Sequence, residues 1–196
     1  MTTRKGVRAR LLDAADSILF IDGPVNTPVD AIIQRAEAGP ASLYAHFGSK
    51  DGITTAALER RLEVWSTVWQ EEIDRAGSDA ARLLAIFPAL ERYQRDYLTE
   101  RWCAFSATAA AIPRPSAALA EVLKAEDKLL RTRLAEQALP IAGEEAARLV
   151  EQILVAYCGT ITLMLRRDYP DAIAMGHRTA RALLEPWLAA QPSASR

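Results

Sequence analysis

The chain has 196 residues, of which 50% are hydrophobic and 25% are charged, and this composition excludes an intrinsically disordered protein. Its 24 Lys and Arg residues and 25 Asp and Glu residues leave a formal net charge of -1. No global basic field therefore attracts nucleic acid or anionic lipid, and any such contact needs a local patch. The two cysteines, Cys103 and Cys158, are too few for a disulfide framework and stand in apolar segments, which indicates buried thiols and a reducing compartment.

Neither an export signal nor a membrane span is expected. Asp13 and Asp16 interrupt the apolar stretch that follows the first basic residues, and the core of a signal peptide does not carry such charges. The longest uncharged apolar run, residues 153–165, is shorter than the roughly 18 to 20 residues that cross a bilayer. We therefore expect a buried helix there, a cytoplasmic protein and no membrane partner.

Helical periodicity runs through nearly every segment, and only a few clusters of Pro and Gly interrupt it, so the sequence predicts an all-α protein. Three short helices come first and six longer helices follow them. Ser49 can cap the first of the longer helices, which is the fourth helix of the chain. The segment after residue 190 is expected to be a flexible tail. The predicted ranges are 4–21, 28–37, 40–47, 50–69 and beyond, 79–97 with a kink at Pro88, 100–112, 115–139, 144–167 and 170–190.

Residues 28–47 have the length pattern of a helix-turn-helix, two short helices joined by a tight turn after a longer amphipathic helix. Spacing alone is a weak indication of DNA binding, because short helix pairs are common in α-helical domains. Particular residues make the indication specific. They are Leu12-Asp13-Ala14-Ala15, Gly23, Thr27-x-Val29-x-x-Ile32 and Ser42-Leu43-Tyr44-Ala45-His46-Phe47-Gly48-Ser49-Lys50.

These residues resemble the N-terminal DNA-binding domain of the TetR/AcrR family of transcriptional regulators, over about residues 8–60. The resemblance implies a three-helix DNA-binding domain with a helix-turn-helix, at residues 1–49. It also implies a larger six-helix domain at residues 50–190, which binds an effector and dimerises, before a tail at 191–196. The implied function is that of a homodimeric, ligand-responsive regulator of operator DNA, most often a repressor.

The turn of the motif departs from the family pattern. Where the family has Ala-Gly-Val-Ser, this chain has Ala36-Glu37-Ala38-Gly39. Glu37 replaces the turn glycine and adopts a positive φ less cheaply, while Gly39 replaces the serine cap. We therefore expect a slightly different path of the turn. An acidic Glu37 near phosphates should also weaken DNA binding.

Phosphate contacts are expected around the third helix. Lys50 would stand in the first turn of the fourth helix, where a cation and free backbone N–H groups both meet a phosphate. The resemblance implies further backbone contacts from Thr27, Ser42, Tyr44 and His46. Two other interpretations stay open, a half-buried core position for Tyr44 and a solvated or packing role for His46.

Base reading is expected from the start of the third helix and the exposed face of the second. Pro40 and Ala41 offer only apolar contact, for example with a thymine methyl, whereas the amide of Gln34 can form a bidentate pair with adenine. Arg35 suits a phosphate equally well. The N-terminal cations supply a local basic patch, unless they form a solvated arm: Arg4, Lys5, Arg8 and Arg10.

An enzyme, a cofactor or a metal site is not expected. The chain has no Gly-x-Ser-x-Gly, His-Glu-x-x-His, Walker or Gly-x-Gly-x-x-Gly motif. Its two histidines, His46 and His177, are far apart in the sequence, and no cysteine pair has the spacing of metal ligands.

Large aromatic residues gather in the helices after the motif. From periodicity alone they form an ordinary bundle core, but the resemblance implies an effector pocket between these helices. The expected effector is a small apolar or aromatic molecule. The candidate lining residues are Trp65, Trp69, Phe87, Trp102, Phe105 and Tyr157.

The helix predicted at 144–167 is apolar on more than one face and must be covered on both sides. Gly159 within it indicates the close approach of another helix. With the last helix it resembles the family's dimer interface, for which the candidates are Leu149, Ile153, Ile161 and Trp187. An alternative function also stays open, a small-molecule sensor or protein-interaction module of the same fold without specific DNA binding, because Glu37, Pro40 and Ala41 are unusual DNA contacts.

Overall fold

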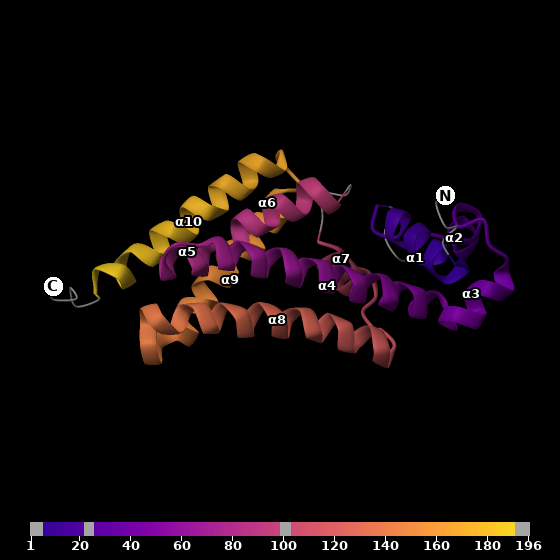
Figure 1. Ribbon diagram of the computed structural model, residues 1–196, viewed down its shortest axis with the longest axis horizontal. Coiled ribbons are helices and arrows are strands. Elements are labelled where there is room, and N and C mark those ends of the chain that lie inside the picture. Colours follow the sequence, from indigo (N-terminus) through magenta and orange to yellow (C-terminus); the bar gives the residue numbers. More distant parts are fainter. Residues whose placement is uncertain (1–5, 22–25, 99–102, 191–196) are drawn as a thin grey trace. The chain divides into compact units, whose positions relative to one another are not determined.

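The computed structural model describes residues 6–21, 26–98 and 103–190, and within them all regular secondary structure is helical, with no strand (Figure 1). The all-α prediction is confirmed. The described residues form α1 (Val7–Ile18), α2 (Val29–Arg35), α3 (Pro40–Phe47), α4 (Lys50–Arg75), α5 (Asp79–Leu84), α6 (Ile86–Tyr97), α7 (Ala104–Ala111), α8 (Ala117–Ala142), the 3-10 helix η1 (Gly143–Glu145), α9 (Ala146–Leu163) and α10 (Tyr169–Ala189).

The single helix predicted over 79–97 is wrong, because the chain forms α5 and α6 with a break at Ala85. Pro88 was expected to kink that helix, but it stands in the first turn of α6. The N–H groups of a first turn have no partner within the helix, so a residue without an N–H fits there. The described residues after α3 therefore form seven α-helices rather than six.

The helices divide into two compact units, which we describe separately. Unit 1 contains residues 1–63 and 102–126, and unit 2 contains residues 64–101 and 127–196. The long helices α4 and α8 each contribute one part to unit 1 and another to unit 2. The two-domain division at residue 50 stays a prediction.

Unit 1 packs around an apolar core from α1 to α4. Leu11, Ile32, Leu43 and Leu58 are fully buried in it, and the burial of each such side chain stabilises a fold by about 1.5 to 3 kcal/mol. Side chains of α7 and of the start of α8 complete the same core: Ala104, Phe105, Leu119 and Val122. The core beneath the helix-turn-helix is therefore not made by the first three helices alone.

An ion-pair network fastens α1 to α4 within unit 1. Arg60 donates to Asp13 Oδ1 and to Asp16 Oδ2, both at 2.7 Å. Arg61 donates to Asp16 Oδ1 at 2.5 Å, and its guanidinium lies 4.2 Å from the centre of the Phe20 ring. Because Arg61 is buried and fully engaged, α1 and α4 hold one relative position in the unit that carries the motif.

In unit 2, α9 packs along α10, and α10 also packs on α5 and α6 (Figure 1). A Cβ on Gly176 would lie 1.7 Å from Thr160 Oγ1, so the contact of α10 with α9 requires glycine. The close helix approach was expected at Gly159, but a Cβ there would meet no atom of the described chain within 4 Å. The glycine that permits the close packing of α10 on α9 is therefore Gly176.

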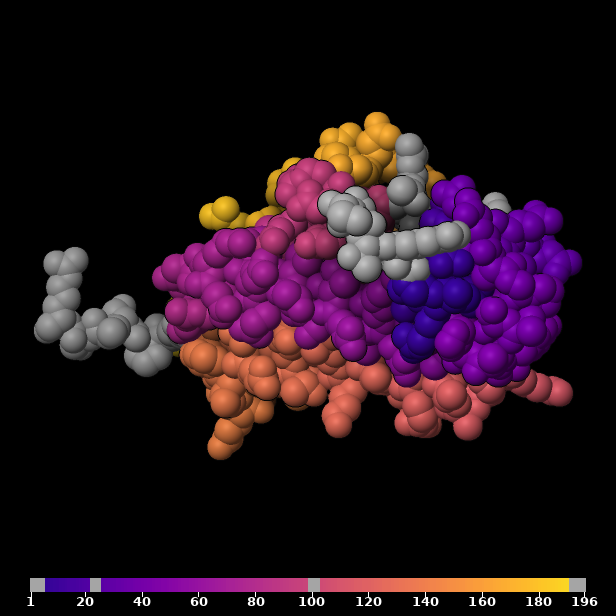
Figure 2. All heavy atoms as spheres, turned by 45° about the vertical axis from the view of Figure 1, so that its right-hand side comes forward, coloured from indigo at the N-terminus to yellow at the C-terminus, as the bar shows by residue number. Residues whose placement is uncertain are grey.

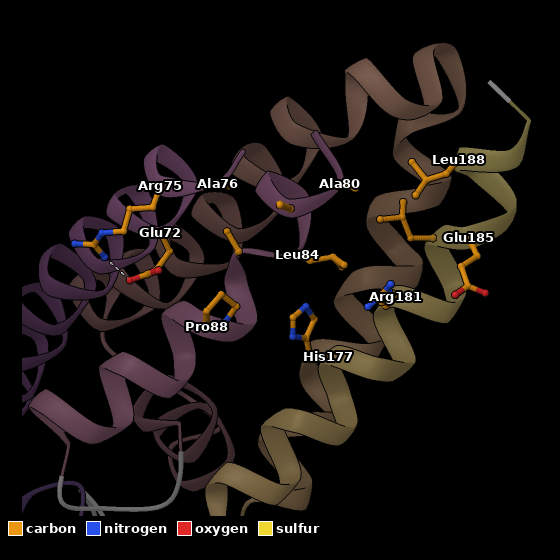
Figure 3. Close-up of a pocket in the computed structure, with 13 residues that line it drawn as sticks. Glu72, Arg75, Ala76, Ala80, Leu84, Pro88, His177, Arg181, Glu185 and Leu188 are labelled. Atoms are coloured by element: carbon orange, nitrogen blue, oxygen red, sulfur yellow. Dashed lines mark hydrogen bonds and ion pairs between the residues drawn. The ribbon is translucent and has the colours of Figure 1, made fainter. Parts of the chain in front are cut away.

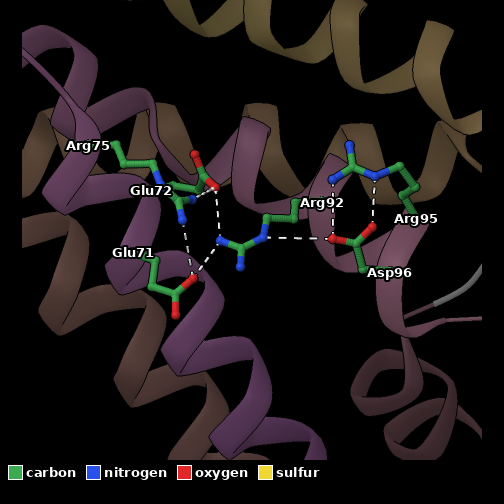
Figure 4. A network of polar contacts seen from close by, with 6 residues as sticks. All are labelled: Glu71, Glu72, Arg75, Arg92, Arg95 and Asp96. Carbon is green, nitrogen blue, oxygen red and sulfur yellow. Dashed lines mark hydrogen bonds and ion pairs between the residues drawn. The ribbon is translucent and has the colours of Figure 1, made fainter.

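Charged side chains link α6 to the part of α4 in unit 2 (Figure 4). Arg92 of α6 lies 2.6 Å from Glu71 Oε2 and 3.2 Å from Glu72 Oε1. Arg75 forms a further ion pair with Glu72 at 2.5 Å, and Arg95 forms one with Asp96 at 2.7 Å. These pairs lie near solvent, where each contributes about 0 to 1 kcal/mol.

The segment Ala117–Leu163 is long and apolar enough for a membrane span by length and composition. It is nevertheless not one helix, because η1 and the positive φ of Gly143 (51°) separate α8 from α9. Long side chains of α8 project from the surface in Figure 2, and the apolar side chains of α9 fill the core of unit 2. The segment has the features of two helices of a globular protein.

Candidate nucleic-acid interface

The turn between α2 and α3 is built on Glu37, which has a φ of 49°. The N–H of Glu37 donates to the carbonyl of Gln34, and the N–H of Ala38 donates to the carbonyl of Ile33, both at 3.1 Å. This is the Schellman arrangement, which normally uses glycine at the left-handed position. The turn thus follows the path that glycine would give, and not the slightly different path that we expected from the sequence. The replacement of glycine by Glu37 instead causes backbone strain of about 1 to 2 kcal/mol.

Arg10 holds this turn from α1. Its Nε donates to the carbonyl of Ala36 at 3.0 Å, and its Nη2 donates to the carbonyl of Glu37 at 3.2 Å. The sequence placed Arg10 in the basic patch, but in the structure its guanidinium binds the carbonyls of the two residues that directly follow α2. Of the other cations in that patch, Arg8 is exposed with its guanidinium 5.2 Å from the centre of the Phe47 ring. Arg4 and Lys5 lie outside the described residues.

The third helix separates its core side from its outer side sharply. Leu43 is fully buried, while the neighbouring Tyr44 is 55% exposed, which disfavours a core position for Tyr44. Pro40 occupies the first helical position and Gly48, with a φ of 72°, ends the helix. The other candidate side chains that lie fully or partly at the surface of unit 1 are Gln34, Arg35, Ala41, Ser42, His46 and Lys50.

Thr27 is placed differently from the other candidates. It is 1% exposed, and its hydroxyl donates to the carbonyl of Ile18 at 3.5 Å. In this position its side chain fastens the start of α2 to the end of α1 rather than facing a phosphate. The sequence could not distinguish these roles, because one hydroxyl suits both.

The start of α4 is built as the sequence predicted. Ser49 Oγ accepts a hydrogen bond from the N–H of Gly52 at 3.0 Å, which confirms Ser49 as the cap. A Cβ on Gly52 would lie 1.9 Å from the carbonyl oxygen of Phe47, so only glycine fits. Burial lowers the pKa of Lys50 from its usual value and the charge of Asp51 opposes this, so a phosphate at this helix N-terminus would favour the charged amine.

Four of the six aromatic candidates for an effector pocket gather in unit 2. Trp65 stacks on Trp69 at 5.6 Å and on Tyr157 at 6.3 Å between ring centres, and Phe87 meets Tyr157 edge-on at 6.5 Å. Phe105 does not join them, because it packs in the core of unit 1. Trp102 lies outside the described residues.

The sequence missed other members of this cluster. Tyr93 lies 5.5 Å from the Trp65 ring, and Arg133 places its guanidinium 5.1 Å from the Trp69 ring centre while donating to the carbonyl of Ser66 at 2.7 Å. The Nε1 of Trp69 is buried without a hydrogen-bond partner in the described chain. The amphipathic period of α6 was the signal that could have found Tyr93.

The candidate dimer residues on α9 lie in the core of the protomer. Leu149 and Ile153 are fully buried and Ile161 is nearly so, all on the side that packs within unit 2. Trp187 is half-buried and donates from Nε1 to Gln152 Oε1 at 3.1 Å, which joins α10 to α9. The outer side of α9 instead carries Val155, which is 72% exposed.

No group of three His, Cys, Asp or Glu side chains in the described ranges could hold a metal ion. What unit 1 presents is a two-helix motif with an exposed recognition helix, a fixed turn and a cation at the next helix N-terminus. This arrangement defines a helix-turn-helix DNA-binding protein.

Comparison with known proteins finds a match to one protein family in the N-terminal part of the chain. Residues 11–57 match the family described as "Bacterial regulatory proteins, tetR family". This match covers the helix-turn-helix, so the N-terminal part of the chain is similar to the DNA-binding domain of TetR-family transcriptional regulators. No curated protein matches it.

Solved structures share the fold over nearly the whole chain. A TetR-family regulator from Streptomyces coelicolor is 19% identical, with 93% of this chain and 96% of that one covered and a TM-score of 0.84. A TetR regulator from Legionella pneumophila is also 19% identical, with 92% and 99% covered and a TM-score of 0.74. The reduced form of E. coli NemR is 14% identical, with 90% and 97% covered and a TM-score of 0.73.

Proposed function

We propose that this protein is a homodimeric repressor that binds operator DNA through α2, α3 and the start of α4 and leaves it when a small molecule binds unit 2. The observation that carries the proposal is the surface of α3, where Leu43 is buried and Tyr44 is exposed beside Pro40 and Ala41. A helix with a buried inner side and an exposed N-terminal half is free to enter a major groove.

A two-fold dimer is supported by the outer sides of α9 and α10. No charged residue occurs from Gln152 to Leu165, and the exposed positions in this stretch include Val155, Gly159 and Thr162. Open space beside Gly159 allows another helix to approach there. The neighbouring outer side of α10 is also uncharged at Thr179, Ala182, Leu183 and Pro186. Such a dimer would present two recognition helices to successive major grooves about 34 to 36 Å apart.

The response to an effector is proposed to act through α4, since this one helix belongs to both units. A ligand that binds best when α4 tilts favours a dimer whose recognition helices no longer fit successive grooves. DNA and ligand then weaken each other by the same factor, and about 1 to 3 kcal/mol of coupling gives a 5- to 150-fold change.

The direct test is a gel-shift assay with DNA that flanks the protein's own gene. We expect a specific complex, and we expect Lys50→Ala to weaken binding to all sequences alike and to reduce the salt slope by about one. Glu59→Ala is the control, because Glu59 is exposed on α4 beyond its first turns.

The second candidate function is a sensor of the same fold without specific DNA binding, which the acidic Glu37 and the apolar Pro40 and Ala41 favour. Equal affinity for flanking and random DNA would establish that alternative. A ligand titration followed by tryptophan fluorescence, with and without operator, then tests the response. Identical ligand affinity in both would exclude ligand-controlled release.

A further inference from the structure

Unit 2 has a cavity of about 530 Å³ between the end of α4, α5, the start of α6 and the second half of α10 (Figure 3). Four alanines leave room for the cavity on its α4 and α5 side. Ala76, Ala80, Ala81 and Ala85 face it, and each side chain ends at Cβ. A volume of this size accommodates a small organic molecule.

The floor of the cavity is apolar. Leu84 and Leu184 are buried beneath it, while Pro88 and Leu188 stand at its sides. None of these four side chains offers a hydrogen bond. The bound part of a ligand that rests on them is therefore apolar.

The cavity lining has two acidic and two basic side chains, but they differ in their partners. On the α4 side Glu72 is already paired with Arg75 and Arg92. On the α10 side Arg181 has no ion pair within the described part of the chain. Figure 3 shows the Arg181 guanidinium beside the His177 ring on the inner side of α10, whereas Glu185 lies at the outer edge. The cation that remains available inside the cavity is Arg181.

His177 gives the cavity a flat polar wall. Its ring stacks on Phe87 at 5.5 Å with 9° between the planes, so its orientation is fixed. Burial, and then the charge of Arg181, lower the pKa of His177, while Glu91 opposes them. A neutral imidazole still offers an N–H to an anion beside Arg181.

A neighbouring cavity of about 360 Å³ shares Pro88 and His177 but is lined by Glu91 and Asp171. This smaller lining has two carboxylates and no Arg or Lys, so an anionic group is favoured on the Arg181 side of His177. This contrast decides the charge of the ligand.

We propose that the cavity between α5 and α10 binds a small organic carboxylate with a flat apolar body, whose carboxylate pairs with Arg181 and whose body lies on Leu84 and Leu184. The inference rests on the proposed function in one respect, namely that this carboxylate is the effector. The site itself does not depend on DNA binding.

Isothermal titration calorimetry of the full chain with 1-naphthoate and 1-naphthamide tests the site. The two probes share a flat apolar body, and only the first has a negative charge. We expect naphthoate to bind about tenfold more tightly, which corresponds to about 1.4 kcal/mol. Equal affinity of the two probes, or no binding of either, would overturn the proposal.

Variants locate the binding. Arg181→Gln should remove the tenfold preference for naphthoate, whereas Arg178→Gln, one turn away and outside the cavity, should keep it. Ala80→Phe should fill the cavity and weaken both probes, with circular dichroism to establish that the variant is folded. Naphthoate affinity that is unchanged in both Arg181→Gln and Ala80→Phe would place the ligand elsewhere and overturn the assignment.

A gel-shift assay with naphthoate tests whether binding at this site changes the affinity for operator DNA. A loss of operator affinity that Arg181→Gln abolishes supports the carboxylate as effector. Arg181-dependent binding of naphthoate without any change in operator affinity upholds the site and overturns its effector role. If no operator complex forms at all, the proposed function fails, while the calorimetric result on the site stands.

Discussion

In α3 the boundary between core and surface falls between neighbours of different character, with Leu43 fully buried and Tyr44 55% exposed. In α9 both sides of that boundary are apolar, since Ile153 is fully buried and Val155 is 72% exposed. In α3 the chemistry of the side chains distinguishes the buried side from the exposed side. In α9 only the packing distinguishes the two sides, because one apolar side lies in the core of unit 2 and the other is exposed.

Two glutamate substitutions on α9 should show the largest difference in their effects on protomer stability and on dimerisation. Ile153→Glu buries a charge in unit 2 and should destabilise the protomer by several kcal/mol. Val155→Glu should leave the protomer folded and break only the dimer. Circular dichroism and light scattering measure the two effects. A folded Ile153→Glu protein, or a dimeric Val155→Glu protein, would contradict the assignment of these sides.

Substitution of one glycine in α9 and one in α10 should give a difference of intermediate size in the free energy of unfolding. Gly176→Ala places a Cβ against Thr160 and should cost about 1 to 3 kcal/mol of unfolding free energy. Gly159→Ala meets nothing in the protomer and should stabilise the isolated helix by up to about 1 kcal/mol. Urea denaturation of the two variants decides this, and equal stabilities would show that the α9–α10 contact is looser than described.

A substitution at the strained turn should give a smaller effect, namely a gain in the free energy of unfolding. Glu37→Gly should relieve the positive φ and raise the free energy of unfolding by about 1 kcal/mol. Glu37→Gln is the control, because it removes the charge and keeps the strain. If thermal unfolding shows the same gain in both variants, charge and not backbone strain is the cause.

The smallest effect concerns His177. Its pKa is lowered in the folded protein, so the unfolded chain takes up a proton first as the pH falls below its usual value near about 6.5. Stability should therefore decrease from that pH down to the lowered pKa and then level off. His177→Phe keeps the stacking on Phe87 and should remove this part of the pH dependence. Identical unfolding curves against pH for both proteins would contradict it.

The sequence sufficed for the all-α fold, because that fold depends on local periodicity and on caps such as Ser49. For the helix-turn-helix, periodicity was a weak indication, and the resemblance of residues such as Tyr44 and Lys50 to the TetR/AcrR pattern made it specific. The sequence did not suffice for side chains whose role depends on a distant neighbour. Phe105 fills the core of unit 1 because α7 packs there, and Arg10 reaches the end of α2 across the fold. Periodicity shows which side of a helix is apolar, but not which element covers it.

The contact between Gly52 and the carbonyl of Phe47 leaves no slack at the joint of α3 and α4. A joint with loose side chains would absorb a small rotation of α4 by local repacking. Here backbone meets backbone, and Ser49 closes the corner with its hydrogen bond to the Gly52 N–H. We therefore expect the first turn of α4 and the recognition helix to move together, so that a rotation of α4 also turns the recognition helix.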